Sequence, residues 1–392
     1  MSRRVTLLGA TGSVGTSAAD VIAAAPDRFE VHAVTARSNC AKLADTARKL
    51  GARRAVVAEE ASLKALRDDL FGSGISAAAG SEAMEEAAAD PVDIVLSAIV
   101  GAAGLRATAA AIRSGSDIAL ANKECLICAG SAFMALAREH KVRVLPVDSE
   151  HNALYQLIEG RDPVDIRTYT LTASGGPFRT WSAERMREAT PQQAVNHPTW
   201  SMGAKISVDS ATLMNKGLEL IEAHHLFNLA PDALDVLVHP QSVVHALVTF
   251  RDGSIHAELG AADVRRPIGY CLHWPERARE PVATLDLAAV GQLTFERADA
   301  GRFPALGLAI QALKQGGGAA TVLNAANEVA VEAFLANRIG FTAIPQIVEI
   351  TLTAAESEGL LATPLSIDEA LMLDAAARRI ARADLKRRSA AA

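Results

Sequence analysis

The feature that most constrains the fold is an alternation of short apolar runs with longer helical patterns through the first 148 residues. The runs "RVTLLGA" and "FEVHAVTA" are each followed by a helical pattern, "SVGTSAADVIAAA" and "NCAKLADTARKLG". The final glycine of the second pattern predicts a helix C-cap. Four shorter runs, "RAVVA", "DIVLSAI", "DIALA" and "VRVLPV", continue the rhythm. Buried strands that alternate with helices are typical of a parallel sheet covered on both faces. The sequence therefore predicts a doubly wound, Rossmann-like α/β domain over residues 1–148.

The remainder of the chain has a different pattern. Residues 149–273 contain "TYTLTASGGPF", "AKISVDSATL", "LDVLVHPQSVVHALVTF" and "GSIHAEL", which we interpret as strands between polar loops, the last two being antiparallel across "RDG". We expect a central α+β domain there. Residues 274–287 are Pro-rich without periodicity, and residues 274–299 are expected to form a linker. Residues 300–392 are helical apart from "GGG" at 316–318. The predicted third domain is therefore α-helical.

Charge and cysteine content exclude several classes of protein. The net charge of −6 lacks the basic excess of a nucleic-acid-binding surface, and no apolar stretch approaches the roughly 20 residues of a membrane span. The "CLIC" motif of Cys125 and Cys128 has no second cysteine or histidine pair to complete a zinc site, so we interpret it as two buried thiols. The absence of a signal-like start suggests a reducing cytoplasm.

The segment "LLGATGSVG" places Gly9, Gly12 and Gly15 between the first expected strand and the first expected helix. Glycines at this point allow a tight turn and let backbone amides approach a pyrophosphate at the helix N-terminus. The alternative is a purely structural turn. The second strand ends in Arg37 and Ser38, where an NAD site would carry a carboxylate. This favours NADP, unless Arg37 is a solvated surface residue.

Two further strand ends carry polar clusters. "LPVDSEHNAL" places Asp148 and Glu150 on either side of Ser149, a pattern that suits either a helix start or a divalent metal site. "LANKECL" places Lys123 at the end of the preceding strand, where it either meets an anionic substrate or is an ordinary exposed lysine. Because ligands bind at the carboxyl ends of parallel strands, we expect both clusters to face one crevice.

Downstream motifs add anion-binding groups. In "MNKGLELIEAHHLF", Asn215, Lys216 and Glu219 share a helix face, although Lys216 and Glu219 also fit a surface ion pair. "TASGGPF" offers Ser174 and backbone amides as an anion nest. "NHPTWSMG" contains His197, Trp200 and Met202 and is typical of a lid over a substrate, although Trp200 can also be a structural anchor.

These motifs in this order resemble the 1-deoxy-D-xylulose-5-phosphate reductoisomerase family. The motifs that carry the resemblance are "GATGSVG", "ANKE", "VDSEHNA", "SGGPF", "HPTWSMG", "KISVDSATLMNKGLE", "HPQSVVHALV" and "LNAANEVAVEAFL". The resemblance implies a homodimer with an NADPH domain, a catalytic domain with a flexible lid near 174–204, and a helical domain. It also implies one divalent metal ion, Mn²⁺, Mg²⁺ or Co²⁺.

The resemblance assigns roles to individual residues. It implies metal ligation by Asp148, Glu150 and Glu219, with Lys123 and His197 as further catalytic residues. The substrate contacts that it implies are Lys123, Ser149, Glu150, Ser174, His197, Ser210, Asn215, Lys216 and Glu219. The dinucleotide contacts that it implies are Thr11, Gly12, Ser13, Val14, Asn39, Asn122, Glu124 and Gly203. Arg37-Ser38 and Cys125 depart from residues common in the family, so Arg37 and Ser38 are dinucleotide contacts on the residue argument alone.

The implied reaction converts a sugar phosphate, 1-deoxy-D-xylulose 5-phosphate, to 2-C-methyl-D-erythritol 4-phosphate in the non-mevalonate route to isoprenoid precursors. A carboxylate-bound cation would polarise the substrate carbonyl, and NADPH would reduce the rearranged aldehyde. No nucleic-acid or membrane partner is expected. Two alternatives stay open at this point: a metal-free NADP-dependent dehydrogenase of the semialdehyde or homoserine type, and a non-catalytic NADP-sensing protein. The sequence does not separate structural from catalytic roles for His239 and His245.

Overall fold

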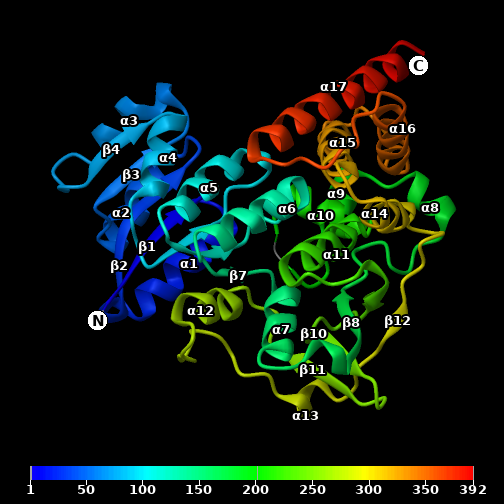
Figure 1. Cartoon of the computed structure of the whole chain (residues 1–392). Coiled ribbons are helices and arrows are strands. Elements are labelled where there is room, and N and C mark those ends of the chain that lie inside the picture. Colours follow the sequence, from blue (N-terminus) through cyan, green and yellow to red (C-terminus); the bar gives the residue numbers. More distant parts are fainter. Residues whose placement is uncertain (1, 201, 392) are drawn as a thin grey trace. The chain divides into compact units, whose positions relative to one another are not determined.

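The computed structural model describes residues 2–200 and 202–391 and divides into two compact units, each discontinuous in sequence (Figure 1). Unit 1 comprises Met1–Cys125, Phe133–Asn152 and Asp263–Ala283. Unit 2 comprises Leu126–Ala132, Ala153–Ala262 and Thr284–Ala392. Most of the expected central region and all of the expected helical region thus belong to unit 2. Residues 263–283, which include the first ten residues of the expected linker, belong to unit 1.

Unit 1 is built on a parallel seven-stranded sheet of order β4-β3-β2-β1-β5-β6-β7. Its strands are β1 (Arg3–Leu8), β2 (Phe29–Ala36), β3 (Arg54–Val57), β4 (Ser76–Ala79), β5 (Ile94–Ser97), β6 (Asp117–Leu120) and β7 (Val144–Pro146). Strand order reverses between β1 and β5, which is where doubly wound sheets bind their ligands. The predicted doubly wound sheet is therefore confirmed. Its inner strands are largely buried, as their apolar composition requires, whereas the edge strand β4 is partly exposed.

Helices cover this sheet. Those of unit 1 are α1 (Ser13–Ala24), α2 (Cys40–Leu50), α3 (Leu63–Asp69), α4 (Ser81–Ala89), α5 (Leu105–Arg113) and α12 (Arg265–His273). Helices α6 (Glu124–Glu139) and α7 (Ser149–Ile158) pass from one unit to the other along the chain, and α6 is interrupted by non-helical backbone at Ala129. The predicted glycine C-cap of α2 is confirmed, because Gly51 has the left-handed φ of 62°.

Unit 2 contains a mixed sheet of order β11-β10-β8-β9-β12. Its strands are β8 (Ile166–Ala173), β9 (Leu234–Val238), β10 (Val244–Phe250), β11 (Ile255–Leu259) and β12 (Glu296–Arg297). The β10–β11 pairing is antiparallel, as predicted from the turn that follows β10, whereas β8 and β9 run parallel. The expected linker contributes β12 to this sheet and also forms the short helix α13 (Leu287–Val290).

Helices dominate the rest of unit 2. They are α8 (Ala183–Arg187), α9 (Pro191–Val195), α10 (Ala204–Ala211), α11 (Met214–Phe227), α14 (Pro304–Gln315), α15 (Ala319–Leu335), α16 (Ala343–Ser357) and α17 (Ile367–Ala391). Short 3-10 turns occupy Pro26–Arg28, Glu60–Ser62, Ala102–Gly104, Pro163–Asp165 and Pro231–Ala233. The predicted break at the three glycines separates α14 from α15. Among the described residues, no helix is both long and apolar enough to cross a membrane.

The strand predicted for "AKISVDSATL" is wrong, because this segment forms α10. Its buried residues Ser207, Val208 and Ala211 recur at three- and four-residue spacing, which is the period of a helix face. The segment is too short for that period to dominate over its β-branched residues. The core of unit 2 gathers around α15, of which the residues from Ala319 to Asn327 are all buried.

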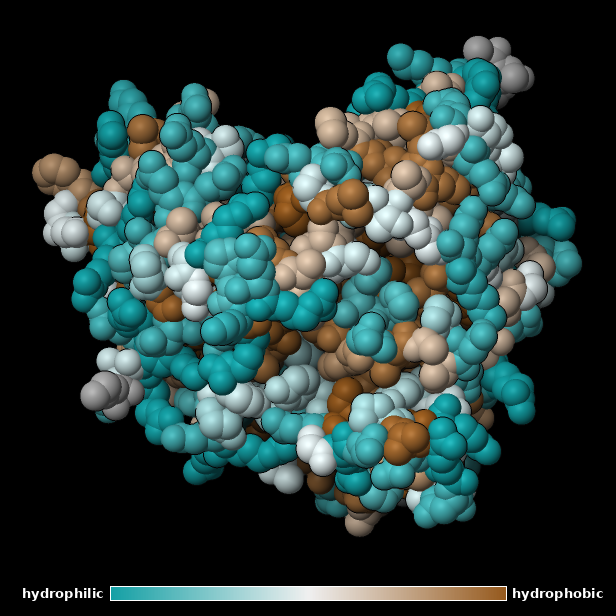
Figure 2. All heavy atoms as spheres, in the orientation of Figure 1, coloured by the Kyte–Doolittle hydropathy of each residue, from teal (hydrophilic) through white to brown (hydrophobic). Residues whose placement is uncertain are grey.

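Hydrophilic residues cover much of the face drawn in Figure 2, with hydrophobic residues among them. The most exposed large apolar side chains are Phe71 at 91% and Leu365 at 81%, and they lie in separate loops. Exposed apolar residues that occur singly are normal for a folded protein and indicate no binding surface.

Candidate active site

The glycine loop after β1 is too tightly packed for larger side chains. A Cβ added to Gly15 would lie 2.3 Å from the carbonyl oxygen of Gly9, and one added to Gly9, where φ is +86°, would lie 2.5 Å from the carbonyl oxygen of Ala98. Helix α1 begins at Ser13 after Gly12, and no side chain caps its N-terminus. The first amides of a helix attract anions, so this loop fits a pyrophosphate.

The turn after β2 carries cations, one of which the sequence argument missed. The Arg37 guanidinium is 86% exposed and pairs with Glu59 at 2.9 Å between Nε and Oε1. Asn39 caps α2 by accepting from the amide of Lys42, and the ammonium of Lys42 donates to the carbonyl oxygen of Thr11 at 2.9 Å. Lys42 therefore stands beside the glycine loop. The sequence feature that could have identified Lys42 is its position three residues after Asn39, which caps α2.

Lys123 and Asp148 meet at the carboxyl ends of two neighbouring strands. Leu120 of β6 pairs with Pro146 of β7, and each strand leads directly into one of the two charged residues. The Nζ of Lys123 lies 2.6 Å from the Oδ2 of Asp148, with side chains 7% and 26% exposed. Because a buried ammonium requires a negative partner, Lys123 is not an ordinary surface lysine.

The stretch between β7 and α7 forms the helix start that was one of the two interpretations drawn from the sequence. Asp148 caps α7, since its carbonyl oxygen accepts from the amide of Asn152 at 2.8 Å. The Ser149 hydroxyl donates to Oε2 of Glu150 at 2.6 Å. Only the backbone carbonyl of Asp148 takes part in the helix cap. Its carboxylate can make other contacts, so the cap and a metal site are compatible.

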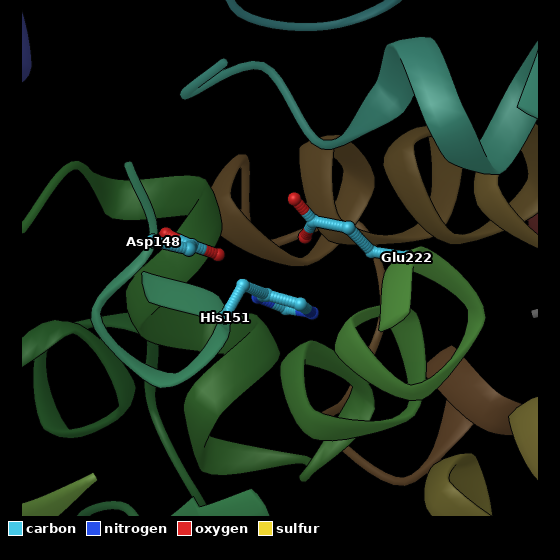
Figure 3. Close-up of side chains that lie close together, drawn as sticks. All are labelled: Asp148, His151 and Glu222. Atoms are coloured by element: carbon cyan, nitrogen blue, oxygen red, sulfur yellow. The ribbon is translucent and has the colours of Figure 1, made fainter. Parts of the chain in front are cut away.

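Two buried ionisable residues near these motifs were missed by the sequence argument. Figure 3 draws His151, which is fully buried on the first turn of α7 that also follows Asp148. It also draws Glu222 of α11, which is 1% exposed. Each lies three residues beyond a predicted metal ligand. Residues at this spacing share a helix face, so the spacing could have identified both residues from the sequence. Of the expected dinucleotide residues at the start of α6, Asn122 is buried and donates to the carbonyl oxygen of Gly101, and Glu124 is buried.

His197 and Ser174, which are distant in sequence, form a hydrogen bond in unit 2. The Nδ1 of His197 accepts from the amides of Thr199 at 3.2 Å and Trp200 at 2.9 Å. The ring proton is therefore on Nε2, which donates to the Ser174 hydroxyl oxygen at 2.8 Å. Burial lowers the pKa of His197, which favours this neutral form. The amide of Gly176 also donates to Ser174 at 3.1 Å, so the serine hydroxyl proton can point toward a ligand.

The loop that carries Ser174 packs closely against α10. Gly176 has a φ of +66°, and a Cβ there would lie 2.5 Å from the carbonyl oxygen of Ser210. The fold of unit 2 thus brings Ser174, His197 and Ser210 into one region, as the sequence motifs suggested. In the expected lid, the Trp200 ring lies 6.4 Å from the ring of His245. Residue 201 of that segment lies outside the described residues.

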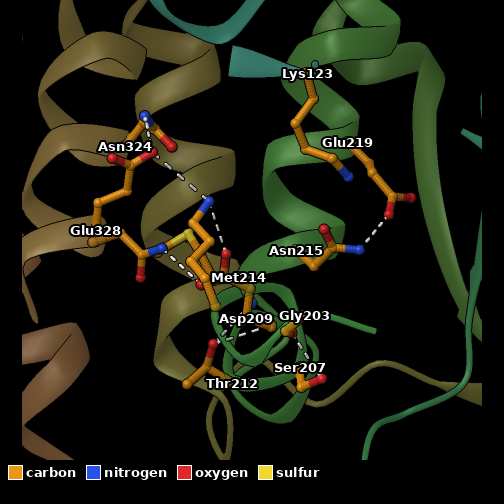
Figure 4. A network of polar contacts seen from close by, with 12 residues as sticks. Lys123, Gly203, Ser207, Asp209, Thr212, Met214, Asn215, Glu219, Asn324 and Glu328 are labelled. Carbon is orange, nitrogen blue, oxygen red and sulfur yellow. Dashed lines mark hydrogen bonds and ion pairs between the residues drawn. The ribbon is translucent and has the colours of Figure 1, made fainter. Parts of the chain in front are cut away.

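Helix α11 presents a buried polar cluster rather than a surface ion pair. Glu219 accepts a hydrogen bond from the side-chain amide of Asn215 (Figure 4). It also forms an ion pair with Lys216. Lys216 and Glu219 are 3% and 1% exposed. Paired charges are costly to bury and are retained mainly for function or specificity. Gly203, another expected dinucleotide contact, is the N-cap of α10.

The two histidines of uncertain role are both buried in unit 2. The Nδ1 of His239 lies 2.8 Å from the carbonyl oxygen of Thr294, and its ring stacks on Phe295 at 4.7 Å between centroids. The Nε2 of His245 lies 3.3 Å from the carbonyl oxygen of Gly260. His239 thus links the end of β9 to the segment before β12. These contacts give His239 a structural role.

Three family models match the chain in succession. One described as 1-deoxy-D-xylulose 5-phosphate reductoisomerase matches residues 5–130. One described as the C-terminal domain of that enzyme matches residues 144–227, and one described as the DXP reductoisomerase C-terminal domain matches residues 259–380. Together they match well over half of the chain.

Individual relatives agree with the family models. The 1-deoxy-D-xylulose 5-phosphate reductoisomerases of Rhodospirillum centenum and Nitrobacter hamburgensis are 54% and 52% identical over 379 residues, which is 97% of this chain and 93% of each relative. The structure of the Zymomonas mobilis enzyme in complex with NADPH is 48% identical, with a TM-score of 0.92 over 98% of this chain and 99% of that chain. A structure of DOX-P reductoisomerase in complex with NADPH, fosmidomycin and magnesium is 42% identical, with a TM-score of 0.92 over 98% of both chains.

Proposed function

The chain belongs to the 1-deoxy-D-xylulose 5-phosphate reductoisomerase family, and we propose which of its residues perform that family's reaction. The enzyme rearranges 1-deoxy-D-xylulose 5-phosphate and reduces it with NADPH to 2-C-methyl-D-erythritol 4-phosphate, in isoprenoid precursor biosynthesis. Neither a metal-free dehydrogenase nor an NADP-sensing protein is favoured, because family models and relatives alike carry the name of the rearranging enzyme.

The observation that carries the proposal is the 2.6 Å contact between Lys123 and Asp148 at the carboxyl edge of the sheet. It holds a cation and a carboxylate together where doubly wound sheets bind ligands. Lys123 would donate to the substrate oxygen on which negative charge develops during rearrangement. Because the ammonium is buried, its charge is poorly screened and acts strongly on that oxygen.

Asp148, Glu150 and Glu219 would hold one divalent cation. The donor set fits, because hard cations such as Mg²⁺ prefer carboxylate oxygens, and ligands must be ionised. Asp148 forms an ion pair with the ammonium of Lys123, and Glu219 forms one with the ammonium of Lys216. Magnesium is present in the related DOX-P reductoisomerase structure, and Mn²⁺ or Co²⁺ would suit the same oxygens. When bound, the cation polarises the substrate carbonyl as a Lewis acid, and NADPH supplies the hydride.

NADPH would lie along the glycine loop of unit 1. Because Gly9 and Gly15 lack side chains, the loop can fold tightly against the backbone of Ala98 and onto itself, and the N-terminus of α1 attracts the pyrophosphate. Arg37, Ser38 and Lys42 would meet the 2′-phosphate side of the dinucleotide. The remaining dinucleotide contacts that we propose are Thr11, Gly12, Ser13, Val14, Asn39, Asn122, Glu124 and Gly203.

The substrate phosphate would bind in unit 2, near the loop after β8. Ser174, Ser210, Asn215 and Lys216 supply hydroxyl, amide and ammonium donors. Neutral His197 orients the Ser174 hydroxyl through its Nε2 proton. Trp200 and Met202 would close over the substrate and exclude water. Ser149 and Glu150 would contact the sugar portion.

We further propose that the enzyme is a homodimer, on the basis of the family resemblance. Static light scattering at micromolar concentration tests this directly: a mass of twice 41.1 kDa is expected, and a monomer mass would contradict it.

The reaction is tested by following NADPH absorbance with 1-deoxy-D-xylulose 5-phosphate. We expect oxidation that EDTA abolishes and that added Mg²⁺ or Mn²⁺ restores. Oxidation unaffected by chelation would refute the metal assignment, whereas no oxidation at any metal concentration would refute the reaction.

A further inference from the structure

We propose that Asp209 and Asn327 are positioning residues for the substrate-phosphate site. Their contact would fix α10 against α15 and thereby align Ser210, Asn215 and Lys216. The inference rests on the proposed role of these three residues in phosphate binding.

The contact between the two residues is short and buried. The Nδ2 of Asn327 donates to the Oδ1 of Asp209 at 2.7 Å, across 118 positions of sequence. Asn327 is fully buried and Asp209 is 1% exposed. A hydrogen bond to a carboxylate in a low-dielectric interior is stronger than an ordinary one. This contact therefore ties α10 to the most buried helix of unit 2.

A chain of alternating charges supports the pair, and Figure 4 labels its two carboxylates, Asp209 and Glu328. Lys205, one turn before Asp209 on α10, forms an ion pair with its Oδ2 at 3.0 Å and lies 4.0 Å from Glu328 of α15. Glu328 in turn pairs with Arg378 of α17 at 2.6 Å. One oxygen of Asp209 thus faces a donor on α15, and the other faces a donor on α10 itself. These two contacts fix the orientation and the position of the carboxylate.

The backbone after Asp209 transmits this position to the proposed phosphate ligands. Ser210 is the next residue, and its carbonyl oxygen is the close neighbour of Gly176 in the Ser174 loop. The Thr212 hydroxyl donates to the carbonyl oxygen of Asp209 at 3.1 Å and accepts from the amide of Met214 at 3.2 Å. Leu213, with a left-handed φ of 59°, closes the turn into α11. Within this short turn, a shift of α10 moves the start of α11 as well.

The decisive variant is Asn327→Leu, which keeps the volume of the side chain and removes the donor. Asp209 then has a buried oxygen without its amide partner, and α10 is expected to shift toward water. We expect the KM for 1-deoxy-D-xylulose 5-phosphate to rise roughly tenfold, with the dissociation constant for NADPH unchanged. Thr321→Val is the matched control on the same helix, because the Thr321 hydroxyl donates to the Cys128 carbonyl oxygen at 2.9 Å and not to α10.

A purely structural role makes a different prediction. If Asn327→Leu and Thr321→Val lower the unfolding temperature alike and both leave the substrate KM unchanged, the inference is wrong. Wild-type enzyme without activity on the sugar phosphate would instead refute the proposed function. Normal substrate binding by Ser210→Ala, with wild-type turnover, would refute the phosphate assignment on which the inference rests.

If Asn327→Leu fails to fold, a second test exchanges the two residue types between positions 209 and 327. Asn327→Asp alone places two carboxylates in contact and should raise the substrate KM strongly. Combining it with Asp209→Asn restores one amide and one carboxylate, with the donor on the other helix. We expect the double variant to recover most of the substrate affinity. A double variant no better than Asn327→Asp would overturn the proposal.

Discussion

The Nε2 of His197 donates to the hydroxyl of Ser174 across 23 positions of sequence, at 2.8 Å. Two backbone amides occupy the other ring nitrogen of His197, so the tautomer that makes this contact is determined by the protein. A neutral histidine thereby holds a serine in the orientation needed to donate to an anion, and the same ring anchors the backbone that leads to Trp200.

His197→Asn should weaken substrate binding, because the shorter side chain cannot reach Ser174 while holding the Trp200 amide. We expect the KM for the sugar phosphate to rise roughly tenfold or more and NADPH affinity to stay unchanged. Initial rates at varied substrate and saturating NADPH measure this. An unchanged substrate KM would show that the Ser174–His197 contact is not used in binding.

Gly15→Ala should weaken NADPH binding, since its Cβ would lie 2.3 Å from the Gly9 carbonyl oxygen and would displace the phosphate loop. A rise of roughly tenfold or more in the NADPH dissociation constant is expected by fluorescence titration. Gly51→Ala is the control: its left-handed φ of 62° makes alanine unfavourable, but its Cβ would meet no atom within 4 Å. It should cost about 1 kcal/mol of stability and leave NADPH affinity intact. Equal NADPH affinities for both variants would contradict the assignment of the loop.

Glu219→Gln should keep NADPH binding and lose turnover, because an amide is a poor ligand for a hard cation. A loss of roughly 100-fold in kcat, with a raised Mg²⁺ requirement, is expected from steady-state rates across a metal titration. A near-normal rate at low Mg²⁺ would remove Glu219 from the metal site.

Stability should fall in mild acid partly through His225. Burial, with a smaller contribution from neighbouring His224, lowers the pKa of His225 from 6.5 to about 4. Between these values the unfolded chain binds a proton that the folded chain does not, so the free energy of unfolding decreases as pH falls from 6.5 to 4. The neutral His225 lowers the free energy of unfolding by about 3 kcal/mol at pH 4, and this loss vanishes above pH 7.

His225→Gln removes this titration, although it also alters the packing on Gly130, where a Cβ would lie within 2.3 Å of the His225 ring atoms. Urea denaturation at pH 7 and pH 4.5 should therefore show a smaller pH dependence in the variant, whatever its stability at pH 7. Equal pH dependence in the two proteins would contradict a buried, neutral His225.

The sequence by itself determined the elements whose signals are local. Alternating apolar runs predicted the parallel sheet, glycines predicted the turn after β1 and the end of α2, and motif order identified the family. Short segments carry a weaker signal for helix or strand. The residues of α10 predict a strand, because two helical turns give too weak a period to outweigh β-branched residues.

Only the tertiary structure decided which distant residues meet. It paired Ser174 with His197 and Asp209 with Asn327, buried the Lys216–Glu219 pair that the sequence also allowed as a surface contact, and revealed Lys42, His151 and Glu222 beside predicted site residues. The physical reason is that residue spacing determines which face of an element a side chain occupies. Which elements then pack together depends on the burial of the whole chain, and that information is not local.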